Sequence, residues 1–204
     1  NKMLLDSFHN AGEEAETYPS VIGRTGAYLT EKRQTASAVL DGVKGYQQTW
    51  EKYLGSIQAV NTQTILTLDE QSTQGTYGGK GKYLKVSYMP DMLAHTQVLV
   101  GEAYDTYTGD LAGCMMSESV MDASGFTVGE TLEFPLWTDA DGETLKLQVC
   151  GIFKEADNTD TFWYTAPNTM EQELFVSEET FDAIVKRFAP EKINYATNVL
   201  LDYT

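Results

Sequence analysis

The clearest fold signal lies in residues 132–149, which read LEFPLWTDADGETLKLQV. Apolar side chains alternate with other residues through both halves of this segment, at Leu132, Phe134, Leu136, Leu145, Leu147 and Val149. Because side chains along a strand point alternately to its two faces, each half predicts a strand with one buried face. The Asp141-Gly142 pair between the halves is typical of a tight turn, so the segment predicts a β-hairpin. A calcium loop is the alternative for this acidic turn, but the run is too short for one.

Shorter elements surround the hairpin. The apolar run Cys114–Met116 predicts a buried strand, and Ser117 can cap a short helix after it. Residues Phe126–Glu130 predict a tight turn, in which Gly129 supplies the freedom in φ that the turn needs. The second hairpin strand continues through Gly151, where we expect a bend or bulge in a small curved sheet.

Helices are predicted on both sides of this region. Apolar residues recur in steps of three and four from Ala36 to Val60, which predicts a helix packed on a sheet. We expect Thr30 to cap it and the helix to break near Gly55. A coiled-coil stalk is the alternative for the same segment. Nearer the C-terminus, Ser177 precedes two glutamates and an apolar stripe, which predicts a second helix start.

The other segments complete the predicted fold. Apolar runs predict strands around 21–29, 62–68, 83–88, 98–102, 174–176 and 199–201. Residues 71–81 are polar and glycine-rich and predict a surface loop; their Gly-Gly-Lys-Gly run lacks the Ser or Thr and the helix that a phosphate-binding loop needs. We therefore predict an α+β fold, with a mixed sheet, packed helices and a small inserted β-rich lobe. The lobe is placed at 98–154, and the core subdomain at 1–97 and 155–204.

The composition excludes several classes of function. The chain has 204 residues, with 14 Lys and Arg against 30 Asp and Glu, and its formal net charge is −16. Such a charge repels phosphate backbones and no basic patch offsets it, so we predict no nucleic-acid partner. Hydrophobic residues make up 42% of the chain, which is enough for a core and excludes wholesale disorder. No apolar run approaches the ~18–20 residues of a membrane-spanning helix. Because the chain opens at Asn1 without a methionine, we expect a fragment of a longer protein.

Few residues suggest chemistry of their own. Cys114 and Cys150 either form a disulfide or lie reduced in the core. The two histidines, His9 and His95, lie far from the cysteines in sequence, and the chain has no Gly-x-Ser-x-Gly motif. The many carboxylates keep a hydrolase with an acid pair as the least favoured alternative. We therefore predict no catalytic residue, no cofactor and no metal.

An aromatic trio is the one candidate for a binding surface. Phe162, Trp163 and Tyr164 could line a ligand groove or a partner surface. The alternative is that they pack in the core and at a sheet edge. If they do line a groove, the chain could be a secreted module that binds a peptide or a sugar.

Several short motifs follow one another in a recognisable order. They are Val98-Leu99-Val100-Gly101, then 114–121 (CMMSESVM), 126–132 (FTVGETL), 147–153 (LQVCGIF) and 174–181 (LFVSEETF). In this order and spacing, the segment from Val98 to about Val185 resembles the extracytoplasmic core domain of MacB-like and FtsX-like ABC transporter permeases. One departure is Gly101-Glu102, where many members of the family carry Gly-Arg. In this resemblance Gly101, Gly129 and Gly151 are architectural turn residues.

The resemblance implies a function as well as a fold. The domain would lie outside the cell membrane, lack an active site, and continue at both ends into transmembrane helices of the same chain. ATP hydrolysis would belong to a separate cytoplasmic ATPase subunit, a peptide or lipid would be the substrate, and the full transporter would be a dimer. The domain would relay conformational change between the membrane helices and an external substrate or partner. Its first and last residues should then lie together at one pole.

Overall fold

In the part of the chain that the structure describes, helices pack on one mixed sheet of ten strands, which is an α+β fold. The computed structural model describes residues 20–29, 35–54, 58–77, 82–188, 190 and 193–202. The strands are β1 (Ser20–Leu29), β2 (Gln58–Leu68), β3 (Gln71–Gly75), β4 (Lys82–Tyr88), β5 (Thr96–Gly101), β6 (Gly113–Ser117), β7 (Thr131–Thr138), β8 (Thr144–Glu155), β9 (Glu173–Phe175) and β10 (Ile193–Asp202). The helices are α2 (Ala36–Leu54), α3 (Glu118–Ser124) and α4 (Glu178–Phe188), with short 3₁₀ helices η1 (Met92–His95) and η2 (Pro167–Thr169).

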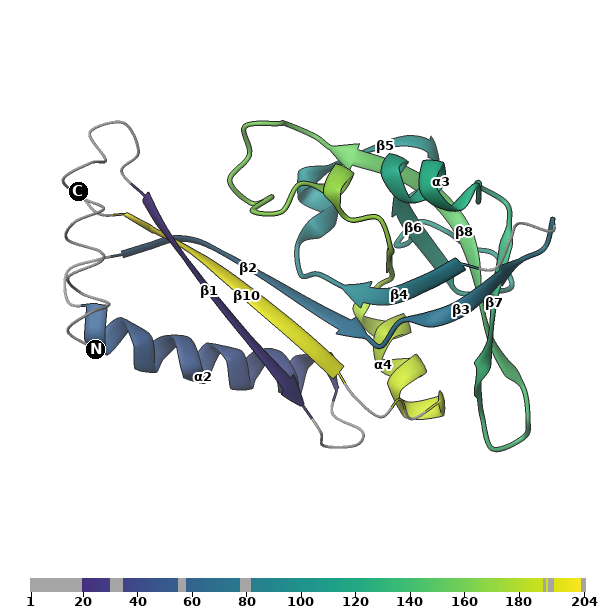
Figure 1. Cartoon of the computed structure of the whole chain (residues 1–204), viewed down its shortest axis with the longest axis horizontal. Coiled ribbons are helices and arrows are strands. Elements are labelled where there is room, and N and C mark those ends of the chain that lie inside the picture. The colour runs from purple at the N-terminus through teal and green to yellow at the C-terminus, as the bar shows by residue number, and fades with distance from the viewer. Residues whose placement is uncertain are drawn as a thin grey trace.

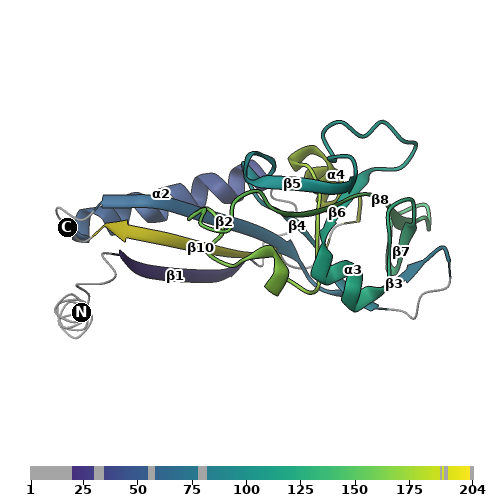
Figure 2. The same ribbon diagram turned by 90° about the horizontal axis from the view of Figure 1, so that it is seen from above.

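Three strands form a long antiparallel ribbon (Figure 1). The central strand is β10, which pairs with β1 along its whole length, from Ser20 opposite Asp202 to Leu29 opposite Ile193. Its other edge pairs with β2, with one register shift. Helix α2 runs alongside the ribbon in both views (Figure 2). A strand rises about 3.3 Å per residue, so the ten-residue strand β10 makes the ribbon roughly 30 Å long.

The other strands form the wider end of the molecule. The last part of β2 stays paired with β10 on one edge and pairs with β4 on the other, with Leu66 opposite Tyr88 and Thr67 opposite Ser87. Strand β8 pairs with β7 and β5 in antiparallel fashion and with β6 in parallel. Strand β9 connects β6 to β4, and β3 connects β4 to β7. The sheet therefore runs through both predicted subdomains, and the division at 98 and 154 stays a prediction.

Two clusters of buried apolar side chains fill the wider end. The larger one packs α3, α4 and the first turn of α2 against the sheet. It includes Leu68 and Ile193, which pair with each other where the ribbon meets the wider end. The smaller cluster comprises Met89, Met92, Met115, Cys150, Phe153, Phe162, Trp163, Met170 and Phe175. Burial of Leu68 and Ile193 anchors the ribbon in the core.

The predicted hairpin and both predicted serine caps are confirmed. Strands β7 and β8 pair in antiparallel fashion, and Gly142 in the turn between them has φ +84°. The Ser117 hydroxyl accepts a hydrogen bond from the Val120 N–H at the start of α3. The Ser177 hydroxyl accepts one from the Thr180 N–H at the start of α4, at 3.1 Å. These side chains satisfy amide groups that have no partner inside the helix.

The alternation predicted for the first hairpin strand is wrong beyond Phe134. Leu136 is 71% exposed, whereas Trp137 is 7% exposed and lies in the core. The register shifts after the pair of Phe134 with Leu145. Pro135 lies at this shift and has no N–H to donate to the ladder, so it favours an irregularity there. A shift by one residue exchanges the two faces, which moves Trp137 into the core and Leu136 out.

Residues 71–81 do not form one loop as predicted. Residues 71–75 are strand β3, which lies between β4 and β7. Thr73 on this strand is fully buried. This polar segment forms a strand because both neighbouring strands supply hydrogen-bond partners, and its central residue, Thr73, is β-branched. The Gly-Gly-Lys-Gly run at 78–81 lies outside the described residues.

Helix α2 starts later than predicted. Its first residue is Ala36, and the Thr35 hydroxyl accepts a hydrogen bond from the Ala38 N–H at 3.1 Å, so Thr35 caps the helix. Thr30 lies outside the described residues. The helix ends at Leu54, beside the predicted break, and residue 60 belongs to β2. The Ala36 N–H donates to the Asp182 carboxylate at 2.6 Å, which ties the start of α2 to α4.

Candidate functional site

The predicted aromatic surface lies mostly inside the molecule. Phe162 and Trp163 are 7% and 8% exposed and belong to the smaller core cluster, whereas Tyr164 is 41% exposed. The Trp163 indole N–H donates to the His95 carbonyl oxygen at 2.8 Å, and its ring stacks with Phe153. Of the trio, therefore, only Tyr164 faces solvent.

A histidine and an aspartate pair beside this cluster. His95 Nδ1 lies 2.6 Å from an Asp160 carboxylate oxygen, and the imidazole stacks on Phe162 at 3.9 Å between ring centroids. The Phe162 backbone N–H donates to the Asp160 carboxylate, which with the His95 hydrogen bond holds the pKa of Asp160 below its ordinary value. The pair fastens the 156–164 loop to η1. The other histidine, His9, lies outside the described residues.

The three predicted turn glycines lie in different settings. Gly101 and Gly129 have positive φ values of +79° and +89°. Gly101 and Gly151 are opposite each other on β5 and β8. A Cβ atom on Gly101 would collide with the Cys150 carbonyl oxygen, and one on Gly151 with the Glu102 carbonyl oxygen. These two positions need glycine because two backbones approach each other too closely for a side chain.

The two cysteines are reduced and buried side by side. Both thiols are free, and the Cys150 thiol donates to the Cys114 carbonyl oxygen at 3.2 Å. Burial raises the pKa of both thiols, that of Cys150 to about 11. Of the two predicted alternatives, the structure has the reduced core residues. Because the thiolate is the reactive form, neither thiol is suited to nucleophilic catalysis.

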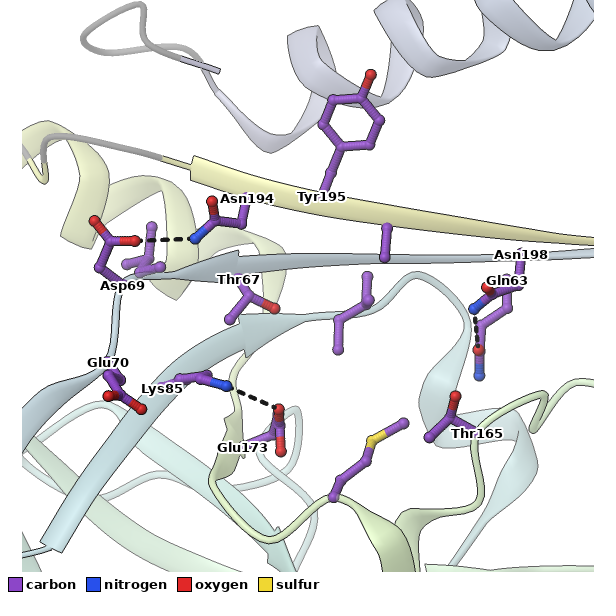
Figure 3. A pocket seen from close by; sticks show the side chains of 14 residues that line it. Gln63, Thr67, Asp69, Glu70, Lys85, Thr165, Glu173, Asn194, Tyr195 and Asn198 are labelled. Carbon is purple, nitrogen blue, oxygen red and sulfur yellow. Dashed lines mark hydrogen bonds and ion pairs between the residues drawn. The ribbon is translucent and has the colours of Figure 1, made fainter. Parts of the chain in front are cut away.

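A pocket of about 730 Å³ lies over one face of the β2–β10 pair (Figure 3). Its floor consists of three cross-strand pairs: Gln63 with Asn198, Ile65 with Ala196, and Thr67 with Asn194. The opposite wall comes from the chain around β9 and includes Thr165, Met170 and Glu173. Along the strands the floor is therefore amide, apolar and then polar again, because alternate residues of a strand share a face.

Two oxygen atoms in this floor have no hydrogen-bond donor. In the described part of the chain, Asn194 Oδ1 and Asn198 Oδ1 are the buried side-chain polar atoms without a partner. The amide nitrogens of both residues are used: that of Asn194 donates to Asp69, and that of Asn198 donates to Gln63 at 3.2 Å. Asn198 is 5% exposed. Leaving a buried acceptor unpaired costs about 1–3 kcal/mol, so each of these two side chains lowers the stability of the fold.

The charged groups of the pocket are mainly acidic. Asp69, Glu70 and Glu173 line it, against a single basic residue, Lys85. The Lys85 ammonium lies 3.8 Å from a Glu173 carboxylate oxygen, so its charge is already compensated (Figure 3). A second pocket of about 710 Å³ adjoins the first and shares Lys85, Thr165, Met170 and Glu173 with it. The site favours a ligand with donors and positive charge over an anion.

The sequence had not indicated this pocket. Its polar floor comes from amide side chains inside strands, at Gln63, Asn194 and Asn198. The strand predicted at the C-terminus began only at residue 199, so both asparagines lay outside any predicted element. Amides at every fourth residue of a strand, with alanine between them, are the signal that could have revealed the face.

Two kinds of feature are absent from the ranges that the structure describes. They hold no group of three or more His, Cys, Asp and Glu that could bind a metal ion. They also contain no helix with the length and hydrophobicity required to cross a bilayer.

The two ends of the ribbon differ in what they join. At the wide end, β2 and β10 enter the core, as Leu68 and Ile193 show. At the narrow end, Ser20 of β1 is opposite Asp202 of β10 (Figure 1). The first and last described residues therefore lie side by side at one pole. The expectation for the first and last residues of the chain itself falls on positions outside the described residues and stays a prediction.

Comparison with known proteins gives structural likenesses. No family model and no curated protein matches the chain. Among solved structures, it is similar to a domain of a protein provisionally named a permease, from Porphyromonas gingivalis, at 12% identity and a TM-score of 0.42, covering 89% of this chain and 74% of that one. It is also similar to the extracellular domain of the ABC-type transporter YknZ from Gram-positive bacteria, at 11% identity and a TM-score of 0.37, covering 86% and 82%.

Proposed function

We propose that this chain is a non-catalytic extracytoplasmic domain of an ABC transporter permease. The observation that carries the proposal is the pairing of β1 with β10, which brings Ser20 and Asp202 together. A domain inserted between two membrane helices must leave and rejoin the membrane at one pole, and this pairing meets that requirement. The motif order from Val98 to Val185 supports the same assignment, because four of the five motifs fall on strands and helices and the fifth, 126–132, forms the turn into β7.

The ribbon suits the relay of movement. Strands β2 and β10 are hydrogen-bonded from Gln58 opposite Asp202 to Leu68 opposite Ile193. The far end of this ladder is buried in the core. A displacement at the narrow end is therefore transmitted to the wide end without passing through a flexible linker. In this proposal the domain moves as a rigid body on hinges at the membrane helices, while a separate cytoplasmic ATPase supplies the energy.

The alternative, a secreted module that binds through its aromatic trio, loses its basis. Phe162 and Trp163 are core residues, and a single exposed tyrosine is a small surface for recognising a peptide or a sugar. We propose the cell membrane, on its outer side, as the location of the domain. A peptide or lipid substrate and a dimeric transporter belong to the same proposal.

Labelling from outside the cell tests this location. We expect an Asn158→Cys variant of the parent protein to react in intact cells with a membrane-impermeant maleimide, because residue 158 lies in an exposed loop. The native chain should not react, since Cys114 and Cys150 are buried and their thiol pKa values are raised. Labelling of the variant only after the cells are permeabilised would place the domain on the inner side. ATP or peptide hydrolysis by the purified chain would contradict its non-catalytic role.

A reversible cross-link tests the relay. The Thr67 and Ser87 hydroxyl oxygens are 3.1 Å apart across the β2–β4 pair, where the ribbon joins the wide end. We expect a Thr67→Cys/Ser87→Cys disulfide to leave transport-coupled ATP hydrolysis of the assembled transporter unchanged, because a rigid body has no joint there. The single Thr67→Cys variant is the control. Activity that is lost on oxidation and restored by reductant would show that the domain bends at this junction.

A further inference from the structure

Strand β5 has one free edge, at the top of the wide end in Figure 1. It pairs with β8 along one side, and no other described strand pairs with it, so the backbone N–H and C=O groups of its other side have no strand partner. Proteins usually protect such an edge with charged side chains, proline or a covering segment. The six residues of β5 read TQVLVG and include neither a charged residue nor a proline. A register shift between Val98 and Val100 divides the edge into two short stretches.

Apolar side chains on this strand are open to solvent. Leu99 is 36% exposed and Val100 is 56% exposed. Their neighbours Gln97 and Gly101 are exposed as well, so no described segment covers the strand. A strand that adds to this edge buries both apolar side chains and completes the backbone hydrogen bonds, which is how extended peptides bind to sheet edges. The residues of that strand opposite Leu99 and Val100 are therefore apolar or β-branched.

The C-terminal end of β5 is acidic. Glu102 follows the strand, and its N–H donates to the Cys150 carbonyl oxygen at 2.9 Å, which holds the residue beside β8. Asp105 and Asp110 are exposed in the loop that comes next. Burial raises the pKa of the Cys150 thiol, and the Glu102 and Asp105 carboxylates raise it further, so both carboxylates lie around this end of the strand. From residue 98 to residue 145 the chain contains no Lys or Arg that compensates them. This end therefore attracts positive charge.

The charges along the edge also set the direction of a bound strand. At the N-terminal end of β5, Lys154 is opposite Gln97 and Glu155 is opposite Thr96, so both signs of charge lie together there. Antiparallel pairing is slightly more stable per residue than parallel pairing, and it places the first residues of an added strand against the last residues of β5. The basic residues of the partner therefore precede its strand.

We propose that the free edge of β5 binds an extended segment of another protein, in which basic residues precede an apolar or β-branched strand. The strand adds antiparallel to β5 and covers Leu99 and Val100, and the basic residues meet the three carboxylates. A second copy of this chain fits less well, because residues 91–95, which precede β5, include no Lys or Arg and each copy carries a formal charge of −16. The proposal does not rest on the transporter role, because the edge lies within this chain.

Fluorescence anisotropy of the labelled peptide KKKVTVTVT, titrated with the purified chain, tests the edge. We expect this peptide to bind about tenfold more tightly than EEEVTVTVT, whose charge is reversed. It should also bind about tenfold more tightly than KKKVTPTVT, which has the same charge but carries a proline without an N–H in the middle of the strand. Equal binding of the proline peptide would overturn the proposal, because charge alone would then explain the binding. A folded chain that binds none of the peptides would overturn it as well.

Two pairs of variants locate the binding on β5. We expect Val100→Lys to weaken binding of KKKVTVTVT about tenfold, while Leu136→Lys, at an exposed leucine of β7, leaves it unchanged. Glu102→Lys should weaken it about tenfold, while Asp141→Lys makes the same change of charge in the β7–β8 turn and should leave it unchanged. All four side chains are exposed, so the variants should keep the native melting temperature. Equal effects within both pairs would refute the site, and so would a dimer of the chain alone that Val100→Lys disrupts, since a second copy would then occupy the edge.

Discussion

Replacing Gly101 by alanine should lower the free energy of unfolding by about 2–5 kcal/mol. Two effects add at this position. The residue has φ +79°, which costs an L-residue with a side chain about 1–2 kcal/mol. The new Cβ would also collide with the Cys150 carbonyl oxygen, which already accepts a hydrogen bond from the Glu102 N–H at 2.9 Å. This backbone oxygen cannot move aside without breaking the β5–β8 pairing, so the steric cost is of the order of 1–3 kcal/mol.

A matched glycine separates the two effects. Gly142 has φ +84°, but a Cβ there would meet nothing within 4 Å. We therefore expect Gly142→Ala to cost only the conformational part, about 1–2 kcal/mol. Urea unfolding of the two variants, followed by circular dichroism, gives the comparison. If both variants lose the same free energy of unfolding, the close approach of β5 to β8 does not contribute to the need for glycine at position 101.

Local sequence signals predicted local structure well in this chain. The Asp-Gly turn, the serine caps Ser117 and Ser177 and the end of α2 are each set by residues within one turn of the feature. The errors lie where distant partners decide. Strand β3 exists because β4 and β7 border it on both sides, and nothing in residues 71–75 announces those neighbours. The error in β7 has a local origin instead: the register shifts next to Pro135, and a count of alternating residues does not detect a shift inside the strand.

The candidate site was harder to predict than the fold, for the same physical reason. The aromatic trio was conspicuous in sequence because aromatic residues are typical of binding surfaces, but they are equally typical of cores. The amides at 63, 194 and 198 are inconspicuous one by one. They become a site only when β2 and β10 pair in register, more than a hundred residues apart in the chain. Sequence alone gave neither that register nor the wall opposite.

Trp163→Ala is the other substitution with a large expected effect, because Trp163 lies in the core and not on a binding surface. We expect it to lower the free energy of unfolding by about 3–5 kcal/mol, the usual range for removing a buried tryptophan. The indole packs against Phe153 and against the edge of Phe162, at 6.2 and 5.2 Å between ring centroids. Its N–H also holds the His95 carbonyl oxygen, which joins η1 to the 156–164 loop. The melting temperature should therefore fall by about 10 °C, since a chain of this size loses roughly 2–4 °C per kcal/mol.

Two neighbouring variants decide whether the loss comes from the core. Trp163→Phe keeps one ring in the cluster but loses the N–H and part of the indole volume, while the Ala156 N–H still donates to the His95 carbonyl oxygen. It should therefore cost about 2 kcal/mol, less than the alanine variant. Tyr164→Ala removes the exposed member of the trio and should change stability by less than about 0.5 kcal/mol. If Trp163→Ala instead unfolds like the native chain, the indole does not pack in the core. In that case a binding surface around Trp163 becomes the better account of the trio.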